Sequence, residues 1–277
     1  MKTLFVSDLD GTLFNSDAEL SERTIEVINS FISQGMYFTA ATARSVYSVI
    51  PKLKGLNVNV PCILMNGVSI FDMENEEYVR NVCIPCEKSA DIVRFFEESG
   101  QKCFMYKFVD GKLTCFYTEM DSAHMQSFAD IRKNTYKKPF VKCESLYDVI
   151  DENTVYFTKS GKYEVLAHVY EKIKQTDGVS CAFYKDTYDD VWYLEAFSEN
   201  ASKENAVRYL KEKYGFDKVV AFGDNRNDMG MLKYADVSVV VHNAPEEVRE
   251  TADVVTLSND DDGVAEYMLN MKGQILR

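Results

Sequence analysis

Short apolar runs alternate with amphipathic stretches in the N-terminal part of the chain. Residues 4–6, 36–41 and 61–65 are β-rich apolar segments, and each predicts a buried strand. Between them, apolar residues recur at helical spacing after Ser21, and a second, shorter helix is expected from Ser45. Strands that alternate with helices usually pair in parallel through right-handed crossovers. The pattern therefore predicts one half of a doubly wound α/β sheet.

From Asp72 onward the pattern changes, because polar turns and Pro85 interrupt the alternation. Strands are expected at residues 103–109, 113–117 and 154–158, and helices at residues 87–99 and 163–175. Asp110-Gly111 is a hairpin signal between the first two of these strands. This stretch is predicted to form a separate α+β domain that is inserted into the first.

The α/β pattern is predicted to resume near Trp192, and Lys203 is expected to begin a helix. Further strands are expected at residues 218–222, 237–241 and 254–257. The C-terminal part of the chain then completes the sheet that the N-terminal part begins. We assign residues 1–83 and 188–277 to one core domain and residues 84–187 to the inserted domain.

Acidic residues follow two of the predicted core strands. Asp8 and Asp10 come after the first strand, and Asp224 and Asp228 come after the first core strand beyond the insertion. Parallel strands share the edge at which α/β sheets bind ligands, so these four side chains are expected to converge there. Four carboxylates near one point repel each other, and a hard divalent cation such as Mg²⁺ relieves that repulsion. Lys203 is expected to add a fixed positive charge.

Composition narrows the possible functions. The formal net charge of −13 disfavours nucleic acid and anionic membranes as partners. The N-terminus lacks a signal-peptide pattern, no apolar stretch is long enough to span a bilayer, and the seven cysteines are irregularly spaced. A cytoplasmic protein with reduced thiols is therefore expected. The three histidines are widely scattered, so a zinc site or a serine–histidine triad is poorly supported.

An acidic nucleophile, a second acid, a hydroxyl, a lysine and metal-binding carboxylates are the components that phosphoryl transfer requires. In these motifs the chain resembles the haloacid dehalogenase (HAD) superfamily, and specifically its Cof-like sugar-phosphatase group with a type IIB cap. The motifs are Asp8-Leu9-Asp10-Gly11-Thr12, Thr42-Ala43-Arg44, Lys203 and Gly223-Asp224-Asn225-Arg226-Asn227-Asp228. The resemblance covers essentially the whole chain. It implies a Rossmann-like, doubly wound core with an inserted α+β cap domain.

The resemblance also implies roles for individual residues. Asp8 would be the nucleophile that forms an aspartyl-phosphate, and Asp10 would act as general acid and then as general base. Mg²⁺ would be held by the carboxylate of Asp8, the backbone carbonyl of Asp10 and Asp224, with Asp228 in a supporting position or bound through water. Lys203 would neutralise charge on the phosphoryl group.

The remaining motif residues would bind the phosphoryl oxygens. Thr42, the amide N–H of Ala43, Arg44 and Asn227 are the candidates. The family commonly has glycine at the position of Ala43, but alanine keeps the N–H and is not expected to abolish activity.

The expected function is a Mg²⁺-dependent phosphatase that acts on a small phosphorylated metabolite such as a sugar phosphate. The chain is expected to act as a monomer or a weak homo-oligomer. Two alternatives stay open. A phosphomutase would use the same nucleophile and return the phosphoryl group to the sugar, and a sensor would bind a phosphorylated ligand without turnover.

Overall fold

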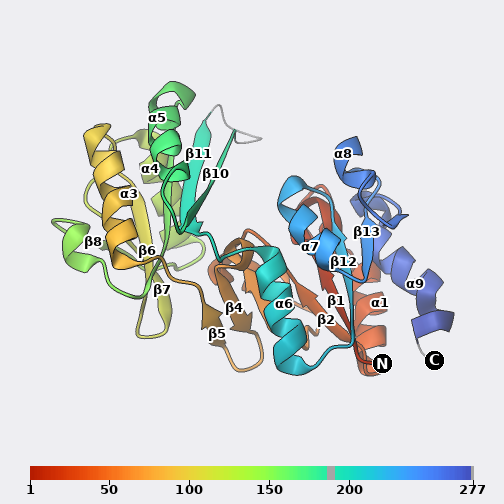
Figure 1. Cartoon of the computed structure of the whole chain (residues 1–277). Helices are drawn as coiled ribbons and strands as arrows, with labels where there is room; N and C mark the ends of the chain where they lie inside the picture. Colours follow the sequence, from red (N-terminus) through yellow and green to blue (C-terminus); the bar gives the residue numbers. More distant parts are fainter. Residues whose placement is uncertain (186–190, 276–277) are drawn as a thin grey trace. The chain divides into compact units, whose positions relative to one another are not determined.

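The computed structural model describes residues 1–185 and 191–275, and these residues form two compact units (Figure 1). The first unit comprises Met1–Arg80 together with Ser202–Arg277, and the second comprises Asn81–Ala201. The boundary that the sequence pattern placed between residues 187 and 188 lies outside the described residues. Within the described part of the chain, no helix combines the length and apolar character needed to cross a membrane.

The first unit is built on a five-stranded parallel sheet in the order β14-β13-β12-β1-β2. Its strands are β1 (Thr3–Ser7), β2 (Tyr37–Ala40), β12 (Lys218–Gly223), β13 (Val237–Val240) and β14 (Val254–Val255). β1 lies at the centre, where Phe5 pairs with Phe38 of β2 and with Val220 of β12. Segments from the two ends of the chain therefore share one sheet.

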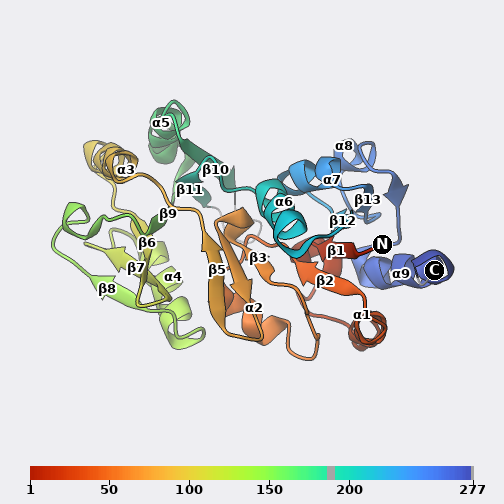
Figure 2. The ribbon, with the colours of Figure 1, turned by 60° about the horizontal axis from the view of Figure 1, so that its bottom comes forward.

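Helices cover both faces of this sheet (Figure 2). They are α1 (Glu22–Ser33), α2 (Val46–Lys52) and α9 (Gly263–Ile275) on one face, and α6 (Lys203–Tyr214), α7 (Met229–Tyr234) and α8 (Glu246–Arg249) on the other. Alternate residues of β1 explain the two cores, because Phe5 packs on the first face while Leu4 and Val6 pack on the second. The predicted α/β class with a parallel core is confirmed.

One predicted core strand pairs differently from the expectation. β3 (Cys62–Leu64) forms an antiparallel sheet with β4 (Ser69–Asp72) and β5 (Glu77–Asn81), and it meets the parallel sheet through a single bridge between Ala41 and Ile63. The cause is the turn η2 (Met65–Gly67), in which three successive residues have positive φ. This turn reverses the chain immediately after β3, so β3 and β4 form a hairpin, while the bridge between Ala41 and Ile63 keeps the expected parallel direction.

The second unit contains a six-stranded sheet in the order β10-β11-β9-β6-β7-β8, antiparallel except for the pair β7–β8. Its strands are β6 (Phe104–Val109), β7 (Lys112–Tyr117), β8 (Phe140–Lys142), β9 (Thr154–Gly161), β10 (Val179–Lys185) and β11 (Trp192–Ser198). Asp110 and Gly111 both have positive φ, which confirms the predicted β6–β7 hairpin.

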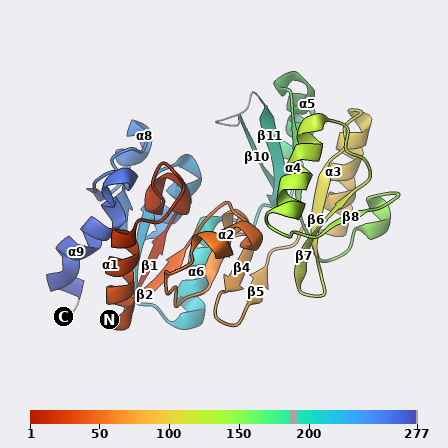
Figure 3. The same cartoon turned by 180° about the vertical axis from the view of Figure 1, so that it is seen from behind.

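Helices lie on both faces of the six-stranded sheet (Figures 1 and 3). α3 (Cys86–Glu98) and α5 (Tyr163–Lys174) cover one face, and α4 (Ala123–Asn134) covers part of the other. The described residues also form the short turns η1 (Leu9–Leu13), η3 (Tyr147–Val149), η4 (Arg226–Asp228) and η5 (Asn259–Asp261).

β11 differs from the sequence-based assignment, which placed residues 188–277 in the core domain. It pairs with β9 and β10, and its Leu194 and Ala196 are buried in the core of the second unit. Leu194 and Ala196 are two residues apart, so they lie on the same face of this antiparallel strand. The first unit resumes at Ser202, one residue before α6.

Candidate active site

The first acidic residue lies where the central strand ends. The amide of Asp8 donates to the carbonyl oxygen of Phe222 in β12 at 3.0 Å, which fixes Asp8 at the edge of the sheet. The chain then turns through Gly11, whose φ is +80°. A Cβ at Gly11 would lie 2.6 Å from Oδ2 of Asp224, so glycine allows the turn to approach this carboxylate. Thr12 Oγ1 donates to Asp224 Oδ1 at 2.9 Å.

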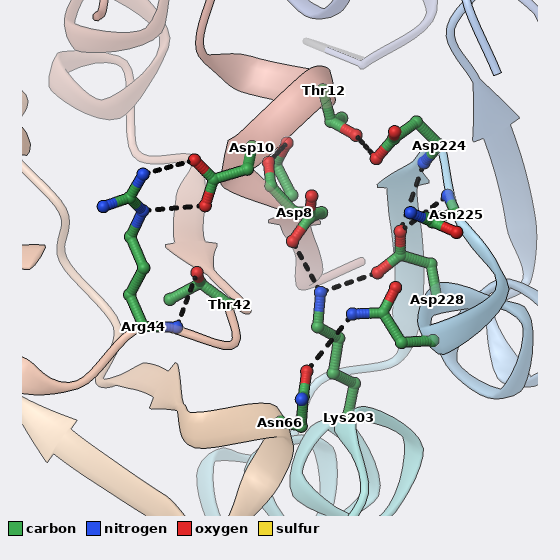
Figure 4. Close-up of polar contacts among 12 residues, drawn as sticks. Asp8, Asp10, Thr12, Thr42, Arg44, Asn66, Lys203, Asp224, Asn225 and Asp228 are labelled. Atoms are coloured by element: carbon green, nitrogen blue, oxygen red, sulfur yellow. Dashed lines mark hydrogen bonds and ion pairs between the residues drawn. The ribbon is translucent and has the colours of Figure 1, made fainter. Parts of the chain in front are cut away.

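Lys203 joins two buried carboxylates (Figure 4). Its Nζ lies 2.5 Å from Oδ1 of Asp8 and 2.7 Å from Oδ1 of Asp228, and the lysine is only 2 % exposed. As the first residue of α6, it is held in place by Ser202, whose backbone packs against Gly67 of the η2 turn. The structure therefore brings the predicted lysine to the predicted nucleophile.

Asp228 uses both carboxylate oxygens within the protein. Oδ1 accepts the bond from Lys203, and Oδ2 accepts from the amides of Asp224 at 3.2 Å and Asn225 at 3.1 Å. The residue is completely buried. Asp228 therefore organises the turn after β12 and orients Lys203.

The electrostatics of the group follow from this burial. Burial raises the pKa of the Asp8 carboxyl well above its ordinary value; Lys203 opposes that shift, and repulsion from Asp228 and Asp224 adds to it. Burial and the neighbouring charge of Asp228 raise the pKa of Asp224 to about 6. Burial alone would lower the pKa of Lys203, but the charges of Asp228 and Asp8 raise the pKa by more than burial lowers it, so the ammonium stays protonated.

The donor set fits a divalent cation. Carboxylate oxygens of Asp8, Asp224 and Asp228 lie within 4.8 Å of one another, and Lys203 is the cation that contacts Asp8 and Asp228. Three carboxylates against one ammonium leave an excess of negative charge in a largely buried group. Oxygen donors that repel each other at this spacing suit a hard cation such as Mg²⁺. The predicted residues Asp8, Asp224 and Asp228 are thus brought together.

The side chain of Asp10 lies outside this carboxylate cluster. In Figure 4 it points toward Arg44, whose Nε and Nη2 donate to its two oxygens at 2.7 and 2.6 Å. Its side chain is 46 % exposed, compared with 8 % for Asp8. The sequence-based hypothesis gave Asp10 a metal contact through its backbone carbonyl, and the position of its carboxylate is compatible with that.

The predicted phosphate-binding residues lie on separate loops. Thr42 is fully buried after β2, its Oγ1 accepts from the Arg44 amide at 3.1 Å, and Ala43 between them is exposed. Asn227 is exposed, and its Nδ2 donates to Oδ1 of Asn66 at 3.2 Å. Arg44 contacts Asp10, so in this structure the four candidates are not gathered around one point.

Two further asparagines contribute to the site. Asn66 links the η2 turn to Asn227. Asn243 donates to the carbonyl oxygen of Gly11 at 2.8 Å and accepts from the amide of Asn259, so it fixes the turn after Asp8. No spacing rule identifies this contact, because it joins loops that are remote in the sequence.

Comparisons with known proteins agree with this geometry. The sequence pattern of the haloacid dehalogenase-like hydrolase family matches residues 5–268. A putative phosphatase from Haemophilus influenzae is 26 % identical over 272 residues, which cover 94 % of both chains. A solved protein from Thermotoga maritima is 27 % identical, with a TM-score of 0.79 over 98 % of this chain and 97 % of its own. A sugar phosphatase of HAD subclass IIB shares the fold, with 23 % identity and a TM-score of 0.72 over 98 % of this chain and 99 % of its own.

The chain belongs to the haloacid dehalogenase-like hydrolase family. It is an enzyme of the HAD phosphatase class, which hydrolyses phosphate esters.

Proposed function

We propose that this protein is a Mg²⁺-dependent phosphatase that hydrolyses a small phosphorylated metabolite through an aspartyl-phosphate on Asp8. The observation that carries the proposal is the buried contact of Asp8 with Lys203, beside the second acid, Asp10, on the same turn. A carboxylate fixed at the end of a central strand is oriented for attack, and the adjacent lysine offsets the charge of an incoming phosphoryl group.

The reaction has two halves. In the first, a carboxylate oxygen of Asp8 attacks phosphorus, the bond from phosphorus to the ester oxygen breaks, and Asp10 gives a proton to the leaving alcohol. In the second, Asp10 takes a proton from water as the water oxygen attacks phosphorus. The aspartyl oxygen–phosphorus bond breaks, and the carboxylate of Asp8 is restored.

The phosphoryl oxygens are held by residues from three loops. Thr42 and the amide of Ala43 bind from the loop after β2, and Lys203 contributes its ammonium from the start of α6. Asn227 completes the set, whereas Arg44, which the motif also assigned to the phosphate, contacts Asp10. This assignment is supported by the position of Thr42, which follows β2 at the same sheet edge at which Asp8 follows β1.

Asp8, the backbone carbonyl of Asp10 and Asp224 would hold Mg²⁺, and Asp228 would support them. When bound, the ion neutralises negative charge on the carboxylates and on the phosphoryl oxygens. The engagement of both Asp228 oxygens by Lys203 and by backbone amides favours a supporting role for this residue.

We further propose that the second unit is the type IIB cap and that the substrate is a sugar phosphate. The similarity to a sugar phosphatase of subclass IIB over 98 % of this chain supports both proposals.

The test is phosphate release from a panel of sugar phosphates, nucleotides and phosphorylated cofactors, with Mg²⁺ and with EDTA. We expect Mg²⁺-dependent release that is strongest for a sugar phosphate and that falls by at least ~10³-fold in Asp8→Asn. Asp17→Asn is the matched control, because Asp17 is an exposed acid in the same N-terminal segment. Near-normal release by Asp8→Asn would refute the covalent mechanism, and tight binding of esters without release would indicate a sensor.

A further inference from the structure

Arg44 and Asp10 are joined by a two-point contact. Nε and Nη2 of Arg44 each donate to a different oxygen of Asp10, at 2.7 and 2.6 Å. A lysine could offer a point charge here, but only a guanidinium provides this planar fork. The fork fixes the plane of the Asp10 carboxylate as well as its position.

Arg44 is itself fixed from several sides. Its amide donates to Thr42 Oγ1 at 3.1 Å, and its carbonyl oxygen accepts from the amide of Met65 at 3.0 Å. Its guanidinium carbon lies 6.0 Å from the ring centroid of the buried Phe14. The backbone on both sides of the Arg44 side chain is therefore anchored to the core, so the fork is preorganised.

Asp10 has no comparable support of its own. It lies beside Gly11 on the η1 turn, its side chain is 46 % exposed, and within the described residues its carboxylate contacts the guanidinium of Arg44. Within the described residues, the carboxylate cluster of Asp8, Asp224 and Asp228 excludes the Asp10 side chain. The orientation of Asp10 therefore depends on Arg44.

We infer that Arg44 is a positioning residue that holds Asp10 as the proton acceptor of the second half-reaction, the hydrolysis of the aspartyl-phosphate. The inference rests on the proposed function, and it assigns Arg44 a task other than the phosphate contact that the motif suggested. Because each Asp10 oxygen accepts a bond from Arg44, the carboxylate is held in a fixed plane with both oxygens oriented. Each oxygen keeps a second lone pair that can receive a water hydrogen.

The proton balance of this step is simple. Water loses one proton to Asp10, its oxygen forms a bond to phosphorus, and the bond from phosphorus to the Asp8 oxygen breaks. Asp10 then carries the proton that a leaving alcohol needs in the next turnover. Loss of Arg44 slows the step in which Asp10 accepts a proton, so phosphorylated Asp8 accumulates.

The experiment compares Arg44→Ala, Arg44→Lys and the unmodified chain with p-nitrophenyl phosphate and Mg²⁺. We expect Arg44→Ala to release about one nitrophenol per active site in a burst and then to turn over ~10- to 100-fold more slowly, a part of the ~10²- to 10⁴-fold that general acid–base catalysis contributes. Acid-quenched samples should contain a larger fraction of phosphorylated enzyme than the unmodified chain. Arg44→Lys should lie between the two, because it keeps the charge but not the fork.

Arg226→Ala is the matched control. Arg226 also forms a two-point contact, with Glu247 at 2.5 and 3.1 Å, on an exposed loop next to the site, and its loss should change neither rate nor phosphoenzyme level. A raised KM without phosphoenzyme accumulation would overturn the inference, because Arg44 would then bind phosphate. Unchanged kinetics would overturn it as well. Failure of the proposed function is a separate result, since it appears as turnover in Asp8→Asn or as no turnover by the unmodified chain.

Discussion

Replacing Lys203 by methionine removes the ammonium that lies 2.5 Å from Asp8 and 2.7 Å from Asp228 while keeping most of the side-chain volume. The side chains of Asp8 and Asp228 are 8 % and 0 % exposed, so bulk water can do little to solvate the two carboxylates in place of the lysine. Removal of one partner from a buried ion pair typically costs ~3–5 kcal/mol. Asp228 retains two backbone N–H donors, which keeps the expected loss near the lower end, at about 3 kcal/mol.

A second lysine of the same helix provides the matched control. Lys211 forms an ion pair with Asp236 at 3.1 Å, and the two side chains are 24 % and 42 % exposed. Exposed ion pairs contribute at most about 1 kcal/mol to the free energy of unfolding, so Lys211→Met should be destabilised far less than Lys203→Met.

The assay is urea unfolding in EDTA, followed by circular dichroism and by hydrogen exchange at the amides of β1 and β12, because the chain has two units. In Lys203→Met the pKa of Asp8, already raised by burial, rises further. A folded-state pKa above the unfolded value stabilises the folded form as the pH falls, so the deficit should shrink as the pH is lowered toward the ordinary pKa of an aspartate. A loss equal to that of Lys211→Met at every pH would refute this account of the site.

Three further predictions concern burial, packing and metal binding. Burial lowers the pKa of Lys138 to about 7; the nearby Cys115 opposes that shift and Arg132 adds to it, so the folded form binds fewer protons than the unfolded form between about pH 7 and about pH 10. The stability of the second unit, followed by Trp192 fluorescence, should therefore rise with pH in that window. Lys138→Met should remove this rise and increase the free energy of unfolding by a few kcal/mol near pH 6. The control Lys137→Met, at an exposed position, should do neither. Gly67→Ala should lower the free energy of unfolding in urea by at least ~2 kcal/mol and reduce turnover, because its Cβ would lie 2.1 Å from the backbone oxygen of Ser202, next to Lys203. Gly35→Ala is the control: φ is similar, at +89°, but no atom lies within 4 Å of the added Cβ, so the loss should be only about 1 kcal/mol. Addition of Mg²⁺ at 100 times its dissociation constant should stabilise the first unit by about 2.7 kcal/mol, and this gain should be absent or much reduced in Asp224→Asn; an equal gain in both proteins would place the ion elsewhere.

The parallel core and the acidic cluster were predictable because both follow from strand ends. Apolar runs that stop at Asp8 and at Asp224 mark two neighbouring strands, and neighbouring parallel strands bring their carboxyl ends together. Lys203 was predictable as well, since a capped helix start places it at a defined point. These assignments depend on periodicity and caps, which local sequence carries.

The pairing of β3 was harder to predict, because it depends on backbone conformation at the η2 turn. Asn66-Gly67 is a turn signal, but Met65 also has positive φ, which a methionine rarely adopts. The placement of β11 had a similar cause. An apolar strand such as β11 suits either sheet until its neighbours are known, and its antiparallel pairing with β9 places it in the second unit.

The contacts of Arg44 and Asn243 could not be derived from spacing. The bond between Arg44 and Asp10 depends on the rotamers of both side chains, and Asn243 contacts Gly11 across more than two hundred residues of sequence. The motif resemblance assigned Arg44 to phosphate binding. It could not decide whether the guanidinium contacts a carboxylate of the protein or a phosphoryl group of the substrate.

The most direct test of the central claim is the mass of the Asp8 peptide after an acid quench during turnover of a sugar phosphate with Mg²⁺. The account predicts one added phosphoryl group on the peptide that contains Asp8, present during turnover and absent once substrate is exhausted or in Asp8→Asn. Full turnover with no phosphate on this peptide, in the unmodified chain and in Arg44→Ala alike, would contradict it.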